Sequence, residues 1–255
     1  MNNPLYFETQ GSGPDVVLLH GWGLHGGVWQ RVAQALAADF CVHCVDLPGH
    51  GHSPSPTPFT LEALGAQLSA AFPLPVHVVG WSLGGLLGME WARQAPDTVS
   101  TLSLVASSPC FIQQPDWPYA QTQAAVQAIG ASLDQQFEAT LNRFLALQTL
   151  GSDSARDTLS ALRELLFSHG RPSGLVAALA VLEQADLRPV LSQIDCPVHL
   201  LYGQRDALTP IGAARWMQGQ FPNATLTEFK AASHAPFLSH EAEFIDALRG
   251  FLLAH

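Results

Sequence analysis

Apolar runs alternate with stretches of helical periodicity along most of this chain. The apolar runs begin near residues 5, 15, 41, 76, 100, 198 and 225, and several are apolar at nearly every position. Runs of this kind are typical of strands that are buried on both faces of a parallel sheet. The pattern therefore predicts an α/β fold, with a mostly parallel twisted sheet and helices on both of its faces.

The alternation of strands and helices fails between Cys110 and Arg188. This stretch contains no predicted strand, and residues 134–148 carry apolar side chains at i, i+4, i+7 and i+8. A helical insertion between two strands of a sheet is typical of a cap over a site. We expect a core made of residues 1–110 and 188–255, with a helical cap at 111–187 inserted in it.

Residues 76–85 predict a buried strand, a tight turn at Ser82 and a helix that begins at once. The turn has the pattern Gly-x-Ser-x-Gly, which holds a serine on a strained corner with its hydroxyl exposed. Gly80 and Gly84 suit this turn because a side chain at either position would crowd the neighbouring strand or helix. The helix N-terminus offers backbone N–H groups to a developing negative oxygen. Ser82 is therefore the candidate nucleophile for acyl transfer; the alternative is an ordinary turn serine.

A serine nucleophile needs a base, and the base needs an acid that orients it. In hydrolases with this turn, the acid follows the serine in the chain and the histidine comes last. Asp206 follows the apolar run at 198–203, at the strand end where open α/β sheets place their sites. His234 lies in the loop after the last predicted strand, at 224–229, and before a helix predicted from about Ser239. These two residues are the candidate acid and base.

Other residues compete for the roles of acid and base. Asp186 precedes Leu-Arg-Pro, and Asp195 precedes a predicted strand where the acid should follow one. His240 falls at the start of the last predicted helix, which ends near Leu253. His20 lies beside the loop that follows the strand predicted at 15–19, and we expect it to brace that loop.

The strand predicted at 15–19 runs into His-Gly-Trp-Gly. The loop after an early strand supplies half of the oxyanion hole in hydrolases with this turn. The donors would be the backbone N–H groups of Trp22 and Leu83, and the Trp22 indole would form one wall of the pocket. A second glycine-rich loop, Asp-Leu-Pro-Gly-His-Gly-His-Ser, follows the strand that begins at Cys41.

Composition excludes several classes of function. The net charge is −10 with one lysine, so nucleic acid is an improbable partner because phosphate neutralisation needs a basic patch. No apolar run reaches about 18 residues, so no membrane span is expected, and Met1–Tyr6 lacks the pattern of a secretory signal.

The four cysteines predict neither a disulfide framework nor a metal site in a chain of this length. Cys41 and Cys44 form a Cys-x-x-Cys pattern, but on a strand they would face opposite sides. We therefore expect core cysteines, no metal, no cofactor and a cytoplasmic protein.

In order along the chain, His-Gly-Trp-Gly, Asp-Leu-Pro-Gly-His-Gly-His-Ser, Gly-Trp-Ser-Leu-Gly-Gly, Gly-Gln-Arg-Asp and Ser-His-Ala-Pro-Phe resemble motifs of the α/β-hydrolase superfamily. The resemblance spans essentially the whole chain. A closer resemblance is carried by five blocks, at 20–24, 80–86, 105–111, 143–149 and 231–237, of which the last two are more specific than the triad because general hydrolases do not need them. They resemble the BioH family of biotin-pathway carboxylesterases, the pimeloyl-[acyl-carrier protein] methyl ester esterases.

This resemblance implies a serine esterase that hydrolyses the methyl ester of an acylated acyl carrier protein, without a cofactor. The substrate contacts that it implies are Trp22, Ser82, Leu83, Phe144, Leu145, Ala146, Leu147, Gln148 and His234. From the helical pattern alone, most apolar cap positions would pack the cap on itself, whereas Phe144 and Leu147 are candidates to cover a pocket.

The resemblance also implies that cap arginines contact the carrier protein. Arg143 and Arg156 stand in matching sequence context, whereas Ala139 and Ser160 occupy places where further arginines are expected. The alternative is that the cap arginines form ordinary pairs along helix faces.

Two other functions stay open. One is a general short-chain carboxylesterase, lactonase or C–C hydrolase of the same fold. The other is a non-catalytic binding module, which would lack a member of the triad, whereas Ser82, Asp206 and His234 are all present. We expect a monomer.

Overall fold

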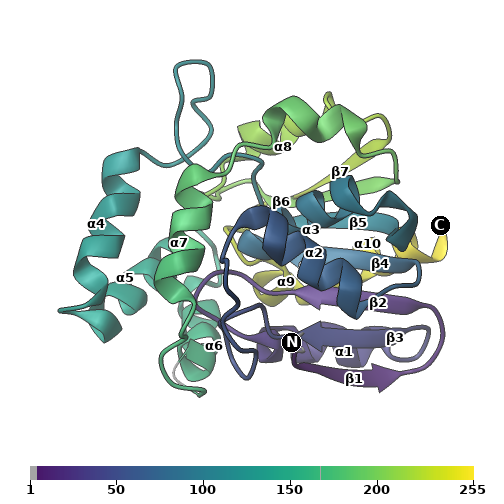
Figure 1. Cartoon of the computed structure of the whole chain (residues 1–255), viewed down its shortest axis with the longest axis horizontal. Coiled ribbons are helices and arrows are strands. Elements are labelled where there is room, and N and C mark those ends of the chain that lie inside the picture. The colour runs from purple at the N-terminus through teal and green to yellow at the C-terminus, as the bar shows by residue number, and fades with distance from the viewer. Residues whose placement is uncertain (1–4, 167) are drawn as a thin grey trace.

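A single seven-stranded sheet forms the centre of the molecule (Figure 1). The computed structural model describes residues 5–166 and 168–255. The strands are β1 (Phe7–Gly11), β2 (Asp15–Leu19), β3 (Cys41–Val45), β4 (Val76–Trp81), β5 (Val99–Val105), β6 (Val198–Gly203) and β7 (Ala224–Phe229). Their order is β1-β3-β2-β4-β5-β6-β7, and only β1 runs antiparallel to its neighbour among the described strand pairs. The predicted α/β fold with a mostly parallel sheet is confirmed.

Helices cover both faces of this sheet. α2 and α3 lie on one face, and α1 and α10 pack together on the other (Figure 1). The core helices are α1 (Gln30–Leu36), α2 (Leu61–Ala71), α3 (Leu83–Gln94), α8 (Ile211–Gln218), α9 (Pro236–Ser239) and α10 (Glu241–Leu253), with short 3₁₀ turns at η1 (Gly26–Trp29), η2 (Pro96–Thr98) and η3 (Arg188–Gln193). None of the described helices is both long enough and apolar enough to cross a membrane.

The last helix begins later than the sequence predicts. The backbone of His240 leaves the helical region, with φ −133° and ψ 47°, and this residue separates the short α9 from α10. Apolar periodicity continues through such a break, so the periodicity did not reveal it. Residues 1–4 lie outside the described residues. Most of the segment 1–6, for which no secretory signal is expected, therefore lies outside them too.

Among the described residues, four α-helices lie between β5 and β6 and gather beside the sheet, at the left of Figure 1. They are α4 (Gln123–Leu133), α5 (Phe137–Thr149), α6 (Ala155–Leu166) and α7 (Leu175–Gln184). An isolated antiparallel bridge joins Cys110 to Asp186, so the two ends of this insertion meet. The segment before α4 packs on the core, because Trp117 contacts Trp216 of α8 with ring centroids 4.9 Å apart.

The topology brings several loops to one edge of the sheet. Because β2, β4, β5, β6 and β7 are parallel, their carboxyl ends all lie at the same edge. The residues that follow these ends include Trp22, Ser82, Ser107, Asp206 and His234. The candidate site therefore lies at this edge.

Candidate active site

Ser82 occupies the turn between β4 and α3, and its backbone is strained. Its φ is 54° and its ψ is −115°, an unusual conformation for a residue with a side chain. A Cβ atom at Gly80 would overlap the backbone of Gly84, and one at Gly84 would overlap the backbone of Leu19. The strand, the tight turn and the immediate helix are therefore present, and both flanking glycines are required by close packing.

Ser107 secures this turn from the neighbouring strand end. Its hydroxyl donates a hydrogen bond of 2.6 Å to the carbonyl oxygen of Ser82. The Tyr202 hydroxyl in turn accepts from the Ser107 N–H at 3.0 Å and donates to the Ser107 carbonyl at 2.6 Å. This role of Ser107 could not be predicted from the sequence, where its one signal is a position just after the end of β5.

His234 and Asp206 form a buried pair. Nδ1 of His234 lies 2.8 Å from Oδ2 of Asp206, and the two side chains are 1% and 0% exposed. The carboxylate also accepts hydrogen bonds from the Leu208 N–H at 2.8 Å, the Thr209 N–H at 3.0 Å and the Thr209 hydroxyl at 2.6 Å. These donors fix the orientation of the carboxylate, so that Oδ2 is placed to accept a hydrogen bond from Nδ1 of His234 and Nε2 is left as the basic nitrogen.

The rival acids and bases lie elsewhere. Asp186 forms an ion pair of 2.7 Å with Arg188, which lowers the pKa of Asp186, and Asp195 is exposed. His240 stands before α10, where its Nδ1 lies 2.9 Å from the Ser239 hydroxyl. The geometry thus favours Asp206 and His234 over the alternatives.

The end of β4, directly before Ser82, also contacts the loop that carries His234. The indole of Trp81, the residue before Ser82, donates a hydrogen bond of 2.8 Å to the carbonyl oxygen of His234. The two rings pack with centroids 5.7 Å apart. Ser82 is 7% exposed and His234 is 1% exposed. Trp81 therefore links the candidate nucleophile to the candidate base.

The loop after β2 is braced by His20, as expected. Nε2 of His20 accepts the Leu47 N–H at 2.9 Å, and Nδ1 donates to the Gly21 carbonyl at 2.7 Å. Burial holds the pKa of His20 well below its usual value, so the ring is neutral and keeps both bonds. The loop positions Trp22, while Leu83 is the first residue of α3 and its N–H has no acceptor within the helix.

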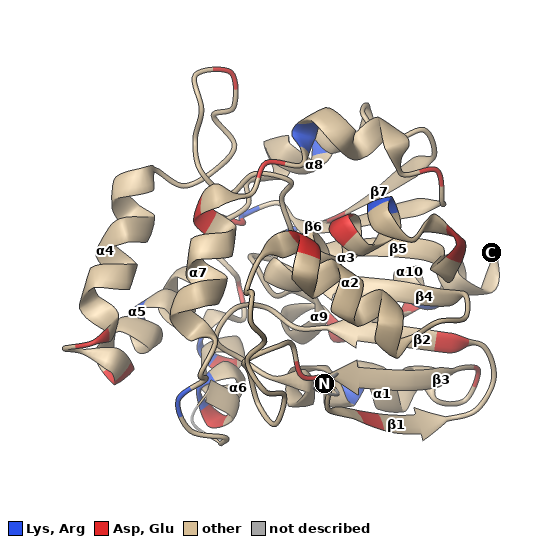
Figure 2. Ribbon diagram, in the orientation of Figure 1, with Lys and Arg blue, Asp and Glu red and all other residues tan. Residues whose placement is uncertain are grey.

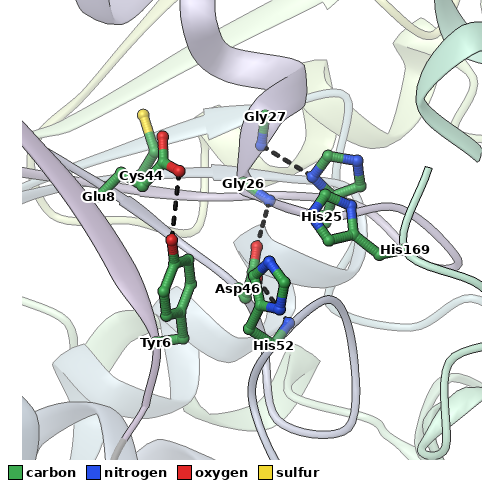
Figure 3. A pocket seen from close by; sticks show the side chains of 9 residues that line it. All are labelled: Tyr6, Glu8, His25, Gly26, Gly27, Cys44, Asp46, His52 and His169. Carbon is green, nitrogen blue, oxygen red and sulfur yellow. Dashed lines mark hydrogen bonds between the residues drawn. The ribbon is translucent and has the colours of Figure 1, made fainter.

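Asp46 organises the second glycine-rich loop. Its carboxylate accepts the Gly26 N–H at 2.7 Å and the His52 N–H at 2.8 Å. A cavity of about 70 Å³ lies beside it, lined also by His25 and His169 (Figure 3). Neither Ser82 nor His234 lines this cavity, so it is separate from the candidate site.

Helices α5 and α7 of the insertion both contact Trp22. Its indole donates to the carbonyl oxygen of Leu175, at the start of α7, at 2.8 Å, and its ring lies edge-on to Phe144 of α5 at 5.0 Å. On the same helix, the carbonyl oxygen of Gln148 accepts the His234 N–H at 3.0 Å. Helix α5 is therefore attached both to the oxyanion-side loop and to the loop of the candidate base.

The other expected substrate residues differ in their placement. Leu145 is buried in the core cluster, whereas Ala146 is exposed and Leu147 is 43% exposed. Gln148 is buried, and its Oε1 atom has no hydrogen-bond partner within the described part of the chain. Phe144 and Gln148 thus contact residues of the candidate site, and all of the expected substrate contacts stay predictions.

Buried neutral histidines near the site predict a loss of stability in acid. Burial lowers the pKa of His50 to about 4. The unfolded chain then binds more protons below about pH 6.5, so the stabilisation is complete above that pH and is lost as pH falls toward 4. For His50 the loss is on the order of 3 kcal/mol of unfolding free energy. His50→Phe should flatten the pH dependence measured by urea unfolding between about pH 7 and about pH 5.

His255→Gln, at the exposed C-terminal end, is the matched control for this measurement and should leave the slope unchanged. An unchanged slope in His50→Phe would show that other groups cause the acid sensitivity.

Comparison with known proteins identifies the family of this chain. A profile of the Alpha/beta hydrolase family matches residues 16–247. The chain belongs to the alpha/beta hydrolase family. It is 59% identical to the pimeloyl-[acyl-carrier protein] methyl ester esterase of Chromobacterium violaceum, over 96% of each chain. It is 41% identical to the protein of the same name from Nitrosomonas europaea, over 94% of this chain and 96% of that one.

Solved structures share the fold at lower sequence identity. An esterase from Exiguobacterium antarcticum superposes with a TM-score of 0.89 at 23% identity, covering 97% of this chain and 94% of that one. An enol-lactonase from Burkholderia xenovorans superposes with a TM-score of 0.85 at 21% identity, covering 98% of this chain and 96% of that one. At this identity the likeness concerns the fold alone.

Proposed function

We propose that this chain is a serine carboxylesterase that hydrolyses pimeloyl-[acyl-carrier protein] methyl ester to pimeloyl-[acyl-carrier protein] and methanol, in biotin biosynthesis. The observation that carries the proposal is the buried pair of His234 and Asp206, linked through Trp81 to the strained turn at Ser82. The 59% identical relative named for this activity supports the choice of substrate. A general esterase or lactonase of the same fold has no observation here that favours it.

In the proposed mechanism Ser82 attacks the ester carbonyl while Nε2 of His234 takes the hydroxyl proton. Asp206 holds the proton on Nδ1 and stabilises the imidazolium that forms. The N–H groups of Trp22 and Leu83 bind the oxyanion, each contributing on the order of 3 kcal/mol to transition-state stabilisation. His234 then protonates the departing methoxide, and water repeats the sequence on the acyl-enzyme.

The insertion at 111–187 would act as the cap over this chemistry. Trp22 packs against Phe144, which supports a shared apolar wall for the acyl chain. Gln148 supports a polar contact, because its side-chain oxygen is buried without a partner on the helix that also holds the backbone of His234. A buried acceptor of this kind gains when a substrate donor or a bound water reaches it.

Arg143 and Arg156 are proposed as contacts for the carrier protein. Both are exposed, and Arg143 hydrogen-bonds the uncharged Gln136 at 3.1 Å. Asp153 does not offset them, since it pairs with Arg205 of the core at 2.6 Å. Figure 2 shows the basic residues of the insertion gathering on and beside α6. By contrast, Arg171 forms an ion pair of 3.0 Å with Asp134, an acid of the same insertion. This pair is of the kind expected if the cap arginines only form ion pairs within the cap.

The absence of arginine at Ala139 and Ser160 would make this contact smaller than the resemblance implies. We further propose a monomer in the cytoplasm, with no nucleic acid or membrane partner. The four cysteines are free, which supports a reducing compartment.

A comparison of two substrates tests the function and the carrier contact together. We expect kcat/KM to be higher for the carrier-bound methyl ester than for free methyl pimelate, because the carrier adds contacts away from the reacting ester. Arg143→Ala combined with Arg156→Ala should lower kcat/KM for the carrier-bound ester roughly tenfold through KM and spare the free ester. Added salt should reduce the wild-type preference, because exposed charges are screened.

Arg31→Ala combined with Arg215→Ala is the matched control, because it removes two exposed positive charges outside the cap. These arginines pair with Glu241 and Glu228. Equal loss on both substrates in the cap variant would show that the arginines stabilise the cap. A wild type that does not prefer the carrier-bound ester would contradict the proposed substrate while leaving the esterase chemistry intact.

A further inference from the structure

Asp15, Cys41 and His43 gather at the amino ends of β2 and β3, away from the edge that carries Ser82. We propose that these three side chains form a binding site for a divalent cation of the zinc class. One ligand atom from each, a carboxylate oxygen, a thiol sulfur and a ring nitrogen, lies within 4.8 Å of the other two. All three residues are partly buried, so the site is held by the sheet and is open to solvent.

The sheet fixes the spacing of the three ligands. Asp15 and Cys41 are direct partners in the parallel ladder of β2 and β3. Cys41 and His43 are two residues apart on one strand, so their side chains share a face. Nε2 of His43 lies 2.8 Å from Oδ1 of Asp15 and 3.7 Å from Sγ of Cys41. Ligands bound tetrahedrally at about 2.0–2.3 Å lie about 3.3–3.6 Å apart, so only small side-chain shifts are required.

His43 is oriented as a metal-binding histidine usually is. Its Nδ1 lies 2.9 Å from the Thr9 hydroxyl, and Thr9 is its direct partner on β1. The rings of Phe7 and Phe72 pack beside it, with centroids 5.5 Å and 5.4 Å away. A hydrogen bond at one ring nitrogen directs the other nitrogen toward the metal and raises its basicity. The ring therefore presents Nε2 to Asp15 and Cys41.

The donor set selects the kind of cation. A thiolate, an imidazole and a carboxylate suit zinc, whereas calcium and magnesium prefer oxygen ligands alone. With thiol and carboxyl both ionised, the ligands carry two negative charges, which a dication neutralises. Burial and the neighbouring Asp15 raise the pKa of Cys41, and a bound cation would reverse this by stabilising the thiolate.

This site differs from the expectation that no metal binds. The motif visible in the sequence is the Cys-x-x-Cys of Cys41 and Cys44, but Cys44 is buried on the other side of β3. The ligands are instead the Cys-x-His of β3 and Asp15 of the neighbouring strand β2. Asp15 reaches them because the register of the β2–β3 ladder places it opposite Cys41. Because the site lies at the opposite end of the parallel strands from Ser82, the cation would stabilise the β1–β3–β2 edge and would take no part in ester hydrolysis.

Titration of the reduced protein with Co²⁺ tests the proposal. We expect a thiolate-to-cobalt charge-transfer absorption that saturates at one equivalent, and displacement of cobalt by Zn²⁺. Cys41→Ser should abolish the absorption, and His43→Gln should weaken cobalt binding at least tenfold. Thr9→Val should weaken binding about 10-fold to 100-fold, because it removes the hydrogen bond that orients the ring. Ester hydrolysis and circular dichroism monitor folding in every variant.

Cys196→Ser is the matched control, since Cys196 is also a free and partly buried cysteine, and it should keep the absorption. Absence of the absorption in the wild type would show that the cluster is only an ion pair of Asp15 with His43. Persistence in Cys41→Ser, or equal loss in Cys196→Ser, would also overturn the site.

Discussion

Ser82→Ala is expected to lower kcat for ester hydrolysis on the order of 10⁶-fold. The substitution removes the oxygen that would attack the ester and leaves the rest of the site in place. Alanine has no larger side chain than serine, so it meets the same backbone strain at φ 54° and the same packing beside Gly80 and Gly84. The folded structure should therefore be retained, and circular dichroism together with the urea midpoint would verify it. Residual turnover would come from the oxyanion hole and from binding alone.

Ser107→Ala is the matched control for this prediction. It deletes the hydroxyl that donates to the carbonyl oxygen of Ser82 from the end of the neighbouring strand, but it leaves the nucleophile intact. We expect a much smaller loss, because a single hydrogen bond contributes about 1 kcal/mol. Protein from a host strain that lacks the homologous esterase avoids contamination. Comparable turnover in Ser82→Ala and Ser107→Ala would remove Ser82 from the mechanism.

The features that could be predicted from the sequence have local signals. Strands that are buried on both faces appear as continuous apolar runs, so the starts of β2, β4 and β6 follow from the sequence. The turn at Ser82 is equally local, because its glycines are required by the tight turn itself. The order of the residues along the chain and their positions after strand ends then predict Asp206 and His234 as acid and base, and their side chains lie 2.8 Å apart.

Contacts between distant segments could not be predicted in this way. Trp81, Ser107 and Arg205 all hold parts of the site or its surroundings, yet their partners depend on how loops far apart in the chain meet. Their spacing along the chain carries no signal for these contacts. The break at His240 could not be predicted either, because apolar periodicity persists through a short interruption.

Thr209 is an exception, since a signal for it was present. An aspartate that begins a turn commonly accepts hydrogen bonds from the backbone two or three residues later. Asp206 does so with Leu208 and Thr209, and the Thr209 hydroxyl adds a third bond at 2.6 Å. The pattern Asp-Ala-Leu-Thr before a proline was visible in the sequence.

Asp206→Asn is expected to lower ester turnover by about 10⁴-fold while the protein stays folded. The carboxylate accepts from Nδ1 of His234, whereas an amide can donate through its nitrogen. If the amide nitrogen faces the ring, His234 takes the tautomer with its proton on Nε2, and it can then no longer accept the proton of Ser82. Asparagine keeps the size of the side chain and can still accept the Leu208 and Thr209 N–H groups through its oxygen. The measurement is kcat on free methyl pimelate.

Asp186→Asn provides the matched control, because it makes the same chemical change in an aspartate at the base of the insertion. That residue pairs with Arg188 at 2.7 Å on the surface, so its loss should cost stability of the order of a surface ion pair, up to about 1 kcal/mol, and little activity. The comparison separates an orienting acid from a structural one, since only the former changes the tautomer of His234. High activity in Asp206→Asn, with low activity in Asp186→Asn or Asp195→Asn, would mean that a different carboxylate orients the base and that the contact at Asp206 is structural.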